Sequence, residues 1–422
     1  MSEWQKVRLG DVCSFQNGFA FKSADFNVNG DHYVVKIKEL KDGQVKLFED
    51  SSKVVFHNSF QKYIIDNNDV LVALTGDPVN KTNPLSWVGR VAINKTNHKI
   101  LLNQRVAKFS PQRNHLNSKF IYYYFRVFDN FYDLAQKATG SASQANISTK
   151  TIEDTILVLP PLVEQIRISK ILGALDDKIE LNNRINCNLE AQAQTLFKRW
   201  VVDFEFPDQN GQPYKSSGGE MKESELGEIP KGWSVGNLTE IANYLNGLAM
   251  QKFRPATNEV GIPVLKIKEL GNKKCDISSD LCSENIKPEY IVENGDVIFS
   301  WSGTLMVDIW CGGKCGLNQH LFKVTSDDYA KWFYYFWTDY HLHKFIRIAK
   351  DKAVTMGHIK REDLNSSEVI IPDSNSLQRM NAIMQPLLNK IIRTNLESNT
   401  LAQLRNSLLP KLMSNQISVE MK

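Results

Sequence analysis

The sequence predicts a mixed α/β (α+β) fold: two similar domains joined by two long antiparallel coiled-coil helices, with pseudo-twofold symmetry. Three observations predict it. Blocks of sequence recur in the same order in the two halves of the chain. Each half ends in a run of apolar residues at alternating steps of four and three, the spacing of a coiled-coil seam. Short apolar runs with period-2 alternation precede each seam and indicate strands.

The repeat is carried by four pairs of blocks. The order is kept throughout, which makes chance resemblance a poor explanation. The offset falls from 227 to 215 residues after Gly76, so the first half holds twelve extra residues, which we expect in an exposed loop. The matching blocks are residues 4–18 and 233–247, VVKIKEL (34–40) and VLKIKEL (264–270), YIIDNNDVLVALTG (63–76) and YIVENGDVIFSWSG (290–303), and LNQR (102–105) and LNQH (317–320).

Within each domain, VVKIKEL, KVVF and DVLVAL read as strands. Alternation would place Lys36 and Lys38 on one face of the first of these strands, and Lys266 and Lys268 on one face of its counterpart. Because the strand is shared, these lysines are interpreted as framework or phosphate contacts rather than as base readers. The runs SKFIYYYFRVF and AKWFYYFW read as helices, whose aromatic residues either stack on bases or form the core; matching positions favour the core.

Each domain is followed by a seam helix. We expect the two seams to pair with each other rather than pack on their own domains, since both are long and share one register. Asn182/Asn186 and Thr394/Ser398 would then form polar layers that fix register and orientation. The predicted seam residues are Leu172, Leu175, Ile179, Asn182, Asn186, Leu189, Leu196, Met384, Leu387, Ile391, Thr394, Ser398, Leu401 and Leu408.

Residues 206–222 are rich in Gly, Ser and Pro and read as a linker between the halves. The predicted organisation follows the chain order of these features. It is a first domain at 1–158, a first spacer helix region at 159–205, a linker at 206–224, a second domain at 225–371 and a second spacer helix region at 372–422.

The composition of the 422 residues is that of an ordinary globular protein, with a net charge of +4, so any nucleic-acid surface must be local. No apolar run is long enough to span a membrane and no signal pattern opens the chain, which predicts a cytoplasmic protein. Cys275, Cys282, Cys311 and Cys315 could bind zinc, but their spacing favours ordinary thiols. Asp208 and Glu220 imitate the carboxylates of a metal-dependent nuclease, yet they lie in the predicted linker. We therefore predict no metal site.

Searches for a phosphate-binding loop, a flipped-adenine motif, HExxH and GxSxG find none, so no catalytic residue is predicted. The positive signals are polar groups at matching points of the two halves, above all the LNQ triplets, because Asn, Gln and Arg side chains can read base edges in the major groove. Singly, each is more readily explained as a solvated loop residue. The candidate DNA-binding residues are Lys81, Asn83, Trp87, Arg90, Asn103, Gln104, Arg105, Ser143, Gln144, Asn146, Trp301, Ser302, Thr304, Lys314, Asn318, Gln319, His320, Lys352, Thr355 and His358.

The whole chain resembles a specificity (S) subunit of a type I restriction-modification enzyme. The resemblance rests on the domain–helix–domain–helix order, on LGEIPKGW (226–233), GDVIFSWSG (295–303) and the LNQ triplets, and on LPPLVEQIRISKILGALDDKIELNNRINCNLEAQAQTLFKRWVVDF (159–204). It implies two target recognition domains, each reading half of a bipartite double-stranded DNA site. It also implies helices that set the spacer and dock two modification (methyltransferase) subunits.

On the same resemblance, S-adenosylmethionine, ATP and Mg are expected on partner subunits, which include restriction subunits, and no cofactor is expected in this chain. Two alternatives stay open: a helical scaffold that binds only proteins, and a self-contained DNA methyltransferase or nuclease. The length difference and the change from LNQR to LNQH predict two different half-sites. The stretch GSASQANIS (140–148) is poorly echoed by AVTMGHIK (353–360), so the roles of its residues are not carried over. Arg105→Ala is expected to weaken one half-site only.

Overall fold

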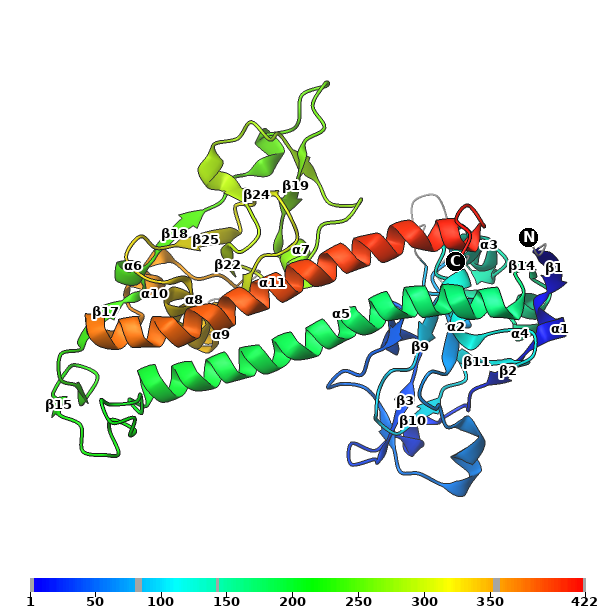
Figure 1. The fold of residues 1–422 in the computed structure, drawn as a ribbon, viewed down its shortest axis with the longest axis horizontal. Coiled ribbons are helices and arrows are strands. Elements are labelled where there is room, and N and C mark those ends of the chain that lie inside the picture. Colours follow the sequence, from blue (N-terminus) through cyan, green and yellow to red (C-terminus); the bar gives the residue numbers. More distant parts are fainter. Residues whose placement is uncertain (1–3, 80–85, 142–143, 352–356, 420–422) are drawn as a thin grey trace. The chain divides into compact units, whose positions relative to one another are not determined.

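The computed structural model describes residues 4–79, 86–141, 144–351 and 357–419 (Figure 1). The chain divides into two compact units. The first unit contains residues 1–177 together with 402–422, and the second contains residues 178–401. The long helices α5 (Leu162–Phe197) and α11 (Ser374–Met413) each contribute residues to both units. No described helix is long and apolar enough to cross a membrane.

The first unit is built on a six-stranded sheet with the order β2-β11-β7-β9-β5-β4, beside a three-stranded sheet with the order β10-β3-β6. The buried aromatic helix α2 (Ser118–Tyr124) and helix α3 (Phe128–Ala135) belong to its main core. The strands of these sheets are β2 (Cys13–Asn17), β3 (His32–Val35), β4 (Leu40–Lys41), β5 (Gln44–Val45), β6 (Lys53–Val54), β7 (Val70–Ala73), β9 (Val91–Ile93), β10 (Ile100–Leu102) and β11 (Val106–Pro111).

The second unit repeats these pairings in two four-stranded sheets, with the orders β18-β25-β22-β23 and β20-β19-β24-β21. Helix α8 (Lys331–Tyr340) takes the place of α2. The strands of these sheets are β18 (Asn243–Asn246), β19 (Ile262–Leu265), β20 (Leu281–Cys282), β21 (Ile291–Val292), β22 (Val297–Ser300), β23 (Met306–Ile309), β24 (Cys315–Leu317) and β25 (Leu321–Thr325).

The registers confirm the sequence repeat. Val70 faces Ile93 across β7 and β9, and Val297 faces Ile309 across β22 and β23. The parallel pair β3–β10 of the first unit has its counterpart in β19–β24 of the second. Because β9 and β23 hold the same register, Val91 corresponds to Val307, and eleven of the twelve extra residues of the first half fall between Gly76 and Val91.

The repeated run VVKIKEL is not a strand throughout, which corrects the prediction. Strand β3 ends at Val35 and β19 ends at Leu265, and the chain then enters a 3-10 turn over Ile37–Glu39 or helix α7 over Ile267–Asn272. The reason is the glutamate of the run. Glu39 is fully buried, where its carboxylate accepts hydrogen bonds from the backbone of Lys36 and from Ser51, closing a helical turn.

The lysines of this run are held by polar groups that lie ten to sixteen residues further along the chain. Lys36 donates to Ser52 at 2.7 Å, and Lys38 pairs with Asp50 at 2.8 Å. In the second unit, Lys266 pairs with Asp280, and Lys268 donates to Ser278 at 2.9 Å. These contacts support the framework interpretation, although alternation along a strand is not what arranges the lysines.

The aromatic runs are core, as their matching positions favoured. Phe120, Tyr122 and Tyr123 of α2 are at most 3% exposed, and Trp332 and Phe333 of α8 are fully buried. The large apolar area that they remove from water stabilises each unit. They are therefore not available as base-stacking platforms.

Helices α5 and α11 run alongside each other in opposite directions within each unit (Figure 1). In the second unit, Asn182 donates to Glu397 at 3.1 Å and Asn186 donates to Asn395 at 2.7 Å. In the first unit, Arg405 of α11 pairs with Asp176 of α5 at 2.5 Å. These contacts confirm the antiparallel helix pair that the sequence predicts, and every predicted seam residue is buried or half-buried.

The polar layer does not form as predicted, because Asn182 and Asn186 do not bond to Thr394 and Ser398. Thr394 and Ser398 are buried, and their hydroxyls find no partner among the described residues. The asparagines bond instead to Asn395 and Glu397, one position away from the predicted seam.

Residues 206–222, which read as a linker, form an ordered part of the second unit. Phe206 stacks on Tyr214 and on Trp233, with ring centroids 4.6 and 4.8 Å apart. Strand β15 (Met221–Lys222) pairs with β16 (Ile229–Pro230). The Gly, Ser and Pro residues of this segment thus serve tight turns on a folded surface.

Candidate functional site

Three segments of the second unit meet where β22 ends. The backbone N–H of Trp301 donates to the carbonyl of His320, in the LNQH turn, at 3.4 Å. The N–H of Ile359 donates to the carbonyl of Trp301 at 3.1 Å. The backbones of Ser302 and His358 form an isolated antiparallel β-bridge. The end of β22, the LNQH turn and the segment around His358 are therefore neighbours, and their side chains lie close together.

The first unit brings together the same three segments. Leu74 donates to the carbonyl of Arg105 at 2.9 Å, and Ile147 donates to the carbonyl of Leu74 at 2.9 Å. Thr75, in β8 (Thr75–Gly76), faces Asn146, in β13 (Gln144–Asn146). Residues 146–147 of the stretch GSASQANIS and residues 358–359 of AVTMGHIK thus share one backbone position, although the two stretches look dissimilar. Three pairs of residues correspond: Thr75 with Ser302, Arg105 with His320, and Asn146 with His358.

The asparagine of each LNQ triplet holds the turn. The side-chain oxygen of Asn103 accepts from the N–H of Arg105 at 3.3 Å, and that of Asn318 accepts from the N–H of His320 at 3.2 Å. Both asparagines are buried. Asn103 and Asn318, proposed from sequence as base readers, are therefore occupied with the turn. The two residues that follow each asparagine are less buried: Gln104 and Arg105 are exposed, and Gln319 and His320 are half-buried.

A glycine lies against each turn. A Cβ atom at Gly18 or at Gly247 would stand 2.2 Å from the backbone oxygen of Asn103 or Asn318. No side chain fits at that distance. The Gly at the end of the first repeated block is thus needed for close approach of two backbones.

Gly247→Ala is expected to displace the LNQH turn and to abolish recognition by the second unit, with a loss of about 2–4 kcal/mol of stability from the overpacked contact. Gly271→Ala is the matched control, since the nearest atom to its Cβ would be 3.6 Å away and the site is helical. Urea unfolding and DNA binding of both variants check this. Equal behaviour of the two variants would contradict it.

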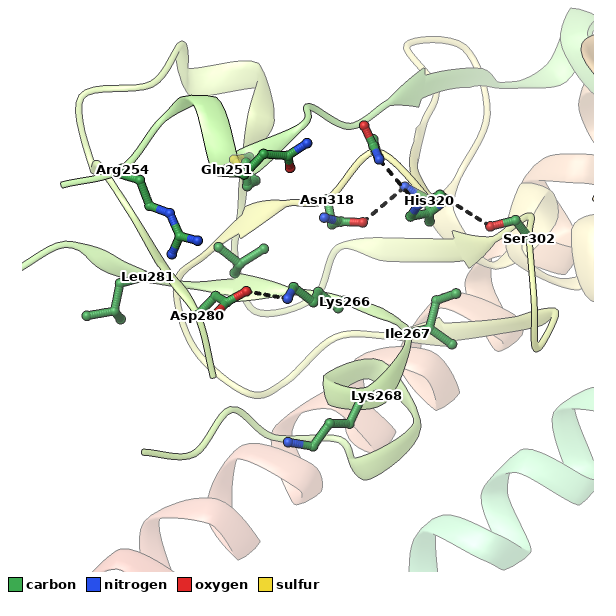
Figure 2. Close-up of a pocket in the computed structure, with 13 residues that line it drawn as sticks. Gln251, Arg254, Lys266, Ile267, Lys268, Asp280, Leu281, Ser302, Asn318 and His320 are labelled. Carbon is green, nitrogen blue, oxygen red and sulfur yellow. Dashed lines mark hydrogen bonds and ion pairs between the residues drawn. The ribbon is translucent and has the colours of Figure 1, made fainter. Parts of the chain in front are cut away.

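Each ring nitrogen of His320 has a polar neighbour in the second site. Its Nδ1 lies 3.0 Å from the hydroxyl of Ser302, and its Nε2 lies 3.3 Å from the amide nitrogen of Gln319 (Figure 2). Trp301 contacts both histidines, with ring centroids 6.1 Å from His320 and 6.2 Å from His358, and donates its indole N–H to Asn246 at 3.0 Å.

A pocket of about 430 Å³ opens beside this turn (Figure 2). Lys266 and Arg254 supply positive charge there, and the Lys266 ammonium lowers the pKa of the Asp280 carboxyl by a direct hydrogen bond. Gln251, Arg254 and Asp280 were not predicted as site residues, because they have no counterpart in the repeated blocks. The pocket is lined by Met250, Gln251, Arg254, Val264, Lys266, Ile267, Lys268, Asp280, Leu281, Ser302, Asn318, Gln319 and His320.

The first site keeps an exposed arginine where the second has His320. Arg105 and Gln104 are exposed, and no hydrogen bond or ion pair joins the Arg105 guanidinium to another residue in the described part of the chain. Trp87 lies against Gly76, and Arg90 stacks over the Trp87 ring at 4.4 Å. Burial lowers the pKa of Arg90, which donates to the carbonyl of Ser86 at 2.7 Å. The predicted candidates Trp87 and Arg90 therefore lie beside residues 73–76, next to the first site.

Within the described residues, no hydrogen bond or ion pair joins the side chains of the other candidates to these sites. Lys314 precedes β24, whereas the LNQH turn follows that strand, and Lys314 approaches Glu284 at 3.9 Å. Thr304 uses its carbonyl to accept from Ser300 at 2.8 Å. Gln144 is half-buried in β13 at its hairpin end. The candidates outside the described residues are Lys81, Asn83, Ser143, Lys352 and Thr355.

The residues considered for metals have other contacts. Asp208 accepts from the backbone of Asn210 and of Gln212, and Glu220 pairs with Lys231 at 2.5 Å. The sulfurs of Cys275 and Cys315 lie 3.8 Å apart. Among the described residues, no group of three or more His, Cys, Asp or Glu side chains could hold a metal ion.

Comparison with known proteins places this architecture in a family. The family model described as type I restriction modification DNA specificity domain matches residues 1–191 and 230–404. A similar curated protein is the MjaIX specificity subunit of a type I restriction enzyme from Methanocaldococcus jannaschii, 27% identical over 342 residues, which are 79% of this chain and 76% of that one. The EcoBI specificity subunit of Escherichia coli is 23% identical over 447 residues, which are 95% of this chain and 88% of that one.

Among solved structures, the crystal structure of the type I restriction-modification S subunit from M. genitalium covers 100% of this chain and 97% of its own, with a TM-score of 0.54 at 14% identity. This likeness supports the fold: two mixed domains and two long helices. The chain belongs to the type I restriction-modification DNA specificity family and is a specificity subunit.

Proposed function

We propose that each unit of this chain reads one half of a bipartite site in double-stranded DNA. One observation carries the proposal: two equivalent backbone frames present different side chains at three matching positions. Arg105, Thr75 and Asn146 stand in one frame where His320, Ser302 and His358 stand in the other. A shared frame with exchanged polar side chains is what two readers of different sequences need.

In this proposal the helices α5 and α11 set the gap between the half-sites and dock two modification subunits, with restriction subunits joining a larger cytoplasmic complex. The chain contributes no catalytic residue. The partners bind S-adenosylmethionine, ATP and Mg, and the modification subunits methylate adenine. The occupied carboxylates Asp208 and Glu220 support this division of work, since each already has a partner within the chain.

The test combines the full chain, the modification subunit of its host and S-adenosylmethionine, and maps methylated adenines by sequencing. We expect methylation at one bipartite sequence, and none when either protein is omitted. Methylation by the chain alone would show a self-contained enzyme. If the modification subunit methylates the same sites with and without this chain, the chain is a scaffold without sequence specificity.

A further inference from the structure

A chain of hydrogen bonds in the second unit fixes the amide of Gln319. The amide nitrogen of Gln319 can only donate, so Nε2 of His320, 3.3 Å away, accepts. The other ring nitrogen, Nδ1, lies 3.0 Å from the hydroxyl of Ser302, so one imidazole ring links Gln319 to Ser302. Ser302 is 4% exposed, and its carbonyl accepts a hydrogen bond at 3.3 Å from the hydroxyl of Ser300, the last residue of β22, so the ring is tied to the end of the sheet.

This arrangement leaves a defined set of free groups on Gln319. One N–H is used by His320, and no hydrogen bond within the described part of the chain uses the second N–H or the side-chain oxygen. A donor beside an acceptor is the complement of the N7 and N6 groups that adenine presents in the major groove. Because the ring of His320 holds the amide in one orientation, little side-chain freedom would be lost on binding.

The first unit lacks this chain of bonds at the same backbone position. Arg105 replaces His320, and its exposed guanidinium bonds no other described residue. The hydroxyl of Thr75, which matches Ser302, is buried without a partner among the described residues. Gln104 is exposed, and the residue that follows it is Arg105 where Gln319 is followed by His320. The guanidinium is the free group here, and its paired N–H donors complement O6 and N7 of guanine.

We propose that the residue at position 105 or 320 selects one base in each half-site: Arg105 reads a guanine, and Gln319, positioned by His320 and the hydroxyl of Ser302, reads an adenine. This rests on the proposed function and adds to it the reading residues and the chemistry of the bases read. Ser302 and His320 act here as positioning residues and Gln319 as the reader.

The test exchanges the two pairs in the full chain and maps methylated adenines with the modification subunit. Ser302→Thr with His320→Arg is expected to change one base pair of the second half-site from adenine to guanine, with the first half-site unchanged. Thr75→Ser with Arg105→His is expected to make the reciprocal change in the first half-site. Because the two exchanges lie in different units, a folding failure in one leaves the other informative.

Ser302→Ala separates positioning from structure. It should lower the preference for adenine at that one base pair roughly tenfold or more, and Ser302→Thr should restore it. Thr325→Ala, at the far end of β25, is the control that should change nothing. A merely structural role would lower recognition of every base of the half-site together.

The outcomes distinguish this inference from the proposed function. If the unaltered chain directs no sequence-specific methylation, the proposed function fails. If it does, but both exchanges leave both half-sites unchanged, the inference is overturned while the proposed function stands. A change at one base pair per half-site, as stated, supports both.

Discussion

Asp176→Ala is expected to lower the free energy of unfolding of the first unit by about 3 kcal/mol. Both oxygens of this carboxylate are used: Oδ1 accepts from Arg405 of α11 at 2.5 Å, and Oδ2 accepts from the hydroxyl of Tyr123 at 2.7 Å. Burial raises the pKa of Tyr123, so its hydroxyl stays protonated and remains a donor. Removing the carboxylate takes the charged partner from Arg405, which keeps only the side-chain oxygen of Asn406, and the acceptor from Tyr123, at a point where three helices meet.

The adjacent Asp177 provides the matched control. Its side chain is 60% exposed and pairs with Lys95 at 3.3 Å, so Asp177→Ala should cost less than about 1 kcal/mol. Urea unfolding measures both variants, and hydrogen exchange in α2 and α5 localises the loss to the first unit. A double-mutant cycle with Arg405→Ala should give a coupling of about 1 kcal/mol or more. Equal stabilities for the two aspartate variants would refute the role assigned to Asp176.

This network also explains where the helix repeat breaks. Extension of the repeat makes Arg405 of α11 the equivalent of Ala193 of α5. An arginine and an alanine are an unlikely pair at equivalent seam positions. Ala193 is fully buried in the core of the second unit, whereas Arg405 meets a carboxylate in the first. Apolar spacing predicts that a seam exists, because it depends on local periodicity. It does not identify Asp176 as a partner, because that contact joins residues 229 positions apart.

The repeat predicted most of the fold, since two copies of one pattern constrain each other. It was less informative about VVKIKEL, where a buried Glu39 bends the chain out of the strand. Alternation over two or three residues does not distinguish a strand from a strand that continues into a turn. The buried side-chain contacts that decide between them come from Ser51, twelve residues away.

For the site, the LNQ triplets were found from sequence, but the division of labour within them was not. Asn, Gln and Arg are all suited to base edges by chemistry alone. Only the burial of Asn103 and its bond to the N–H of Arg105 show that it holds the turn. The equivalence of Asn146 with His358 was also missed, because it is a matter of strand pairing and not of residue similarity.

A heptad inserted into both long helices is expected to lengthen the unread gap of the DNA site by about three base pairs. Seven helical residues add about 10.5 Å at ~1.5 Å each, and DNA rises ~3.4 Å per base pair. A heptad with apolar residues at its two seam positions preserves the seam, whereas a single turn of four residues would shift it. The insertions belong after Asn186 in α5 and before Ile391 in α11, because these residues are joined across the seam at 3.4 Å.

The control for this experiment is a chain with the heptad in α5 alone, because that insertion changes the partners of the polar layer. With heptads in both helices, Asn182 and Asn186 keep Glu397 and Asn395 as partners, and the half-sites themselves should stay the same. With a heptad in α5 alone, apolar residues would face buried Thr394 and Ser398, and directed methylation should be lost. Mapping methylated adenines for both variants measures the gap directly. An unchanged gap in the doubly extended chain would mean that the helices do not set the spacing, and that the two units find their half-sites by some other constraint.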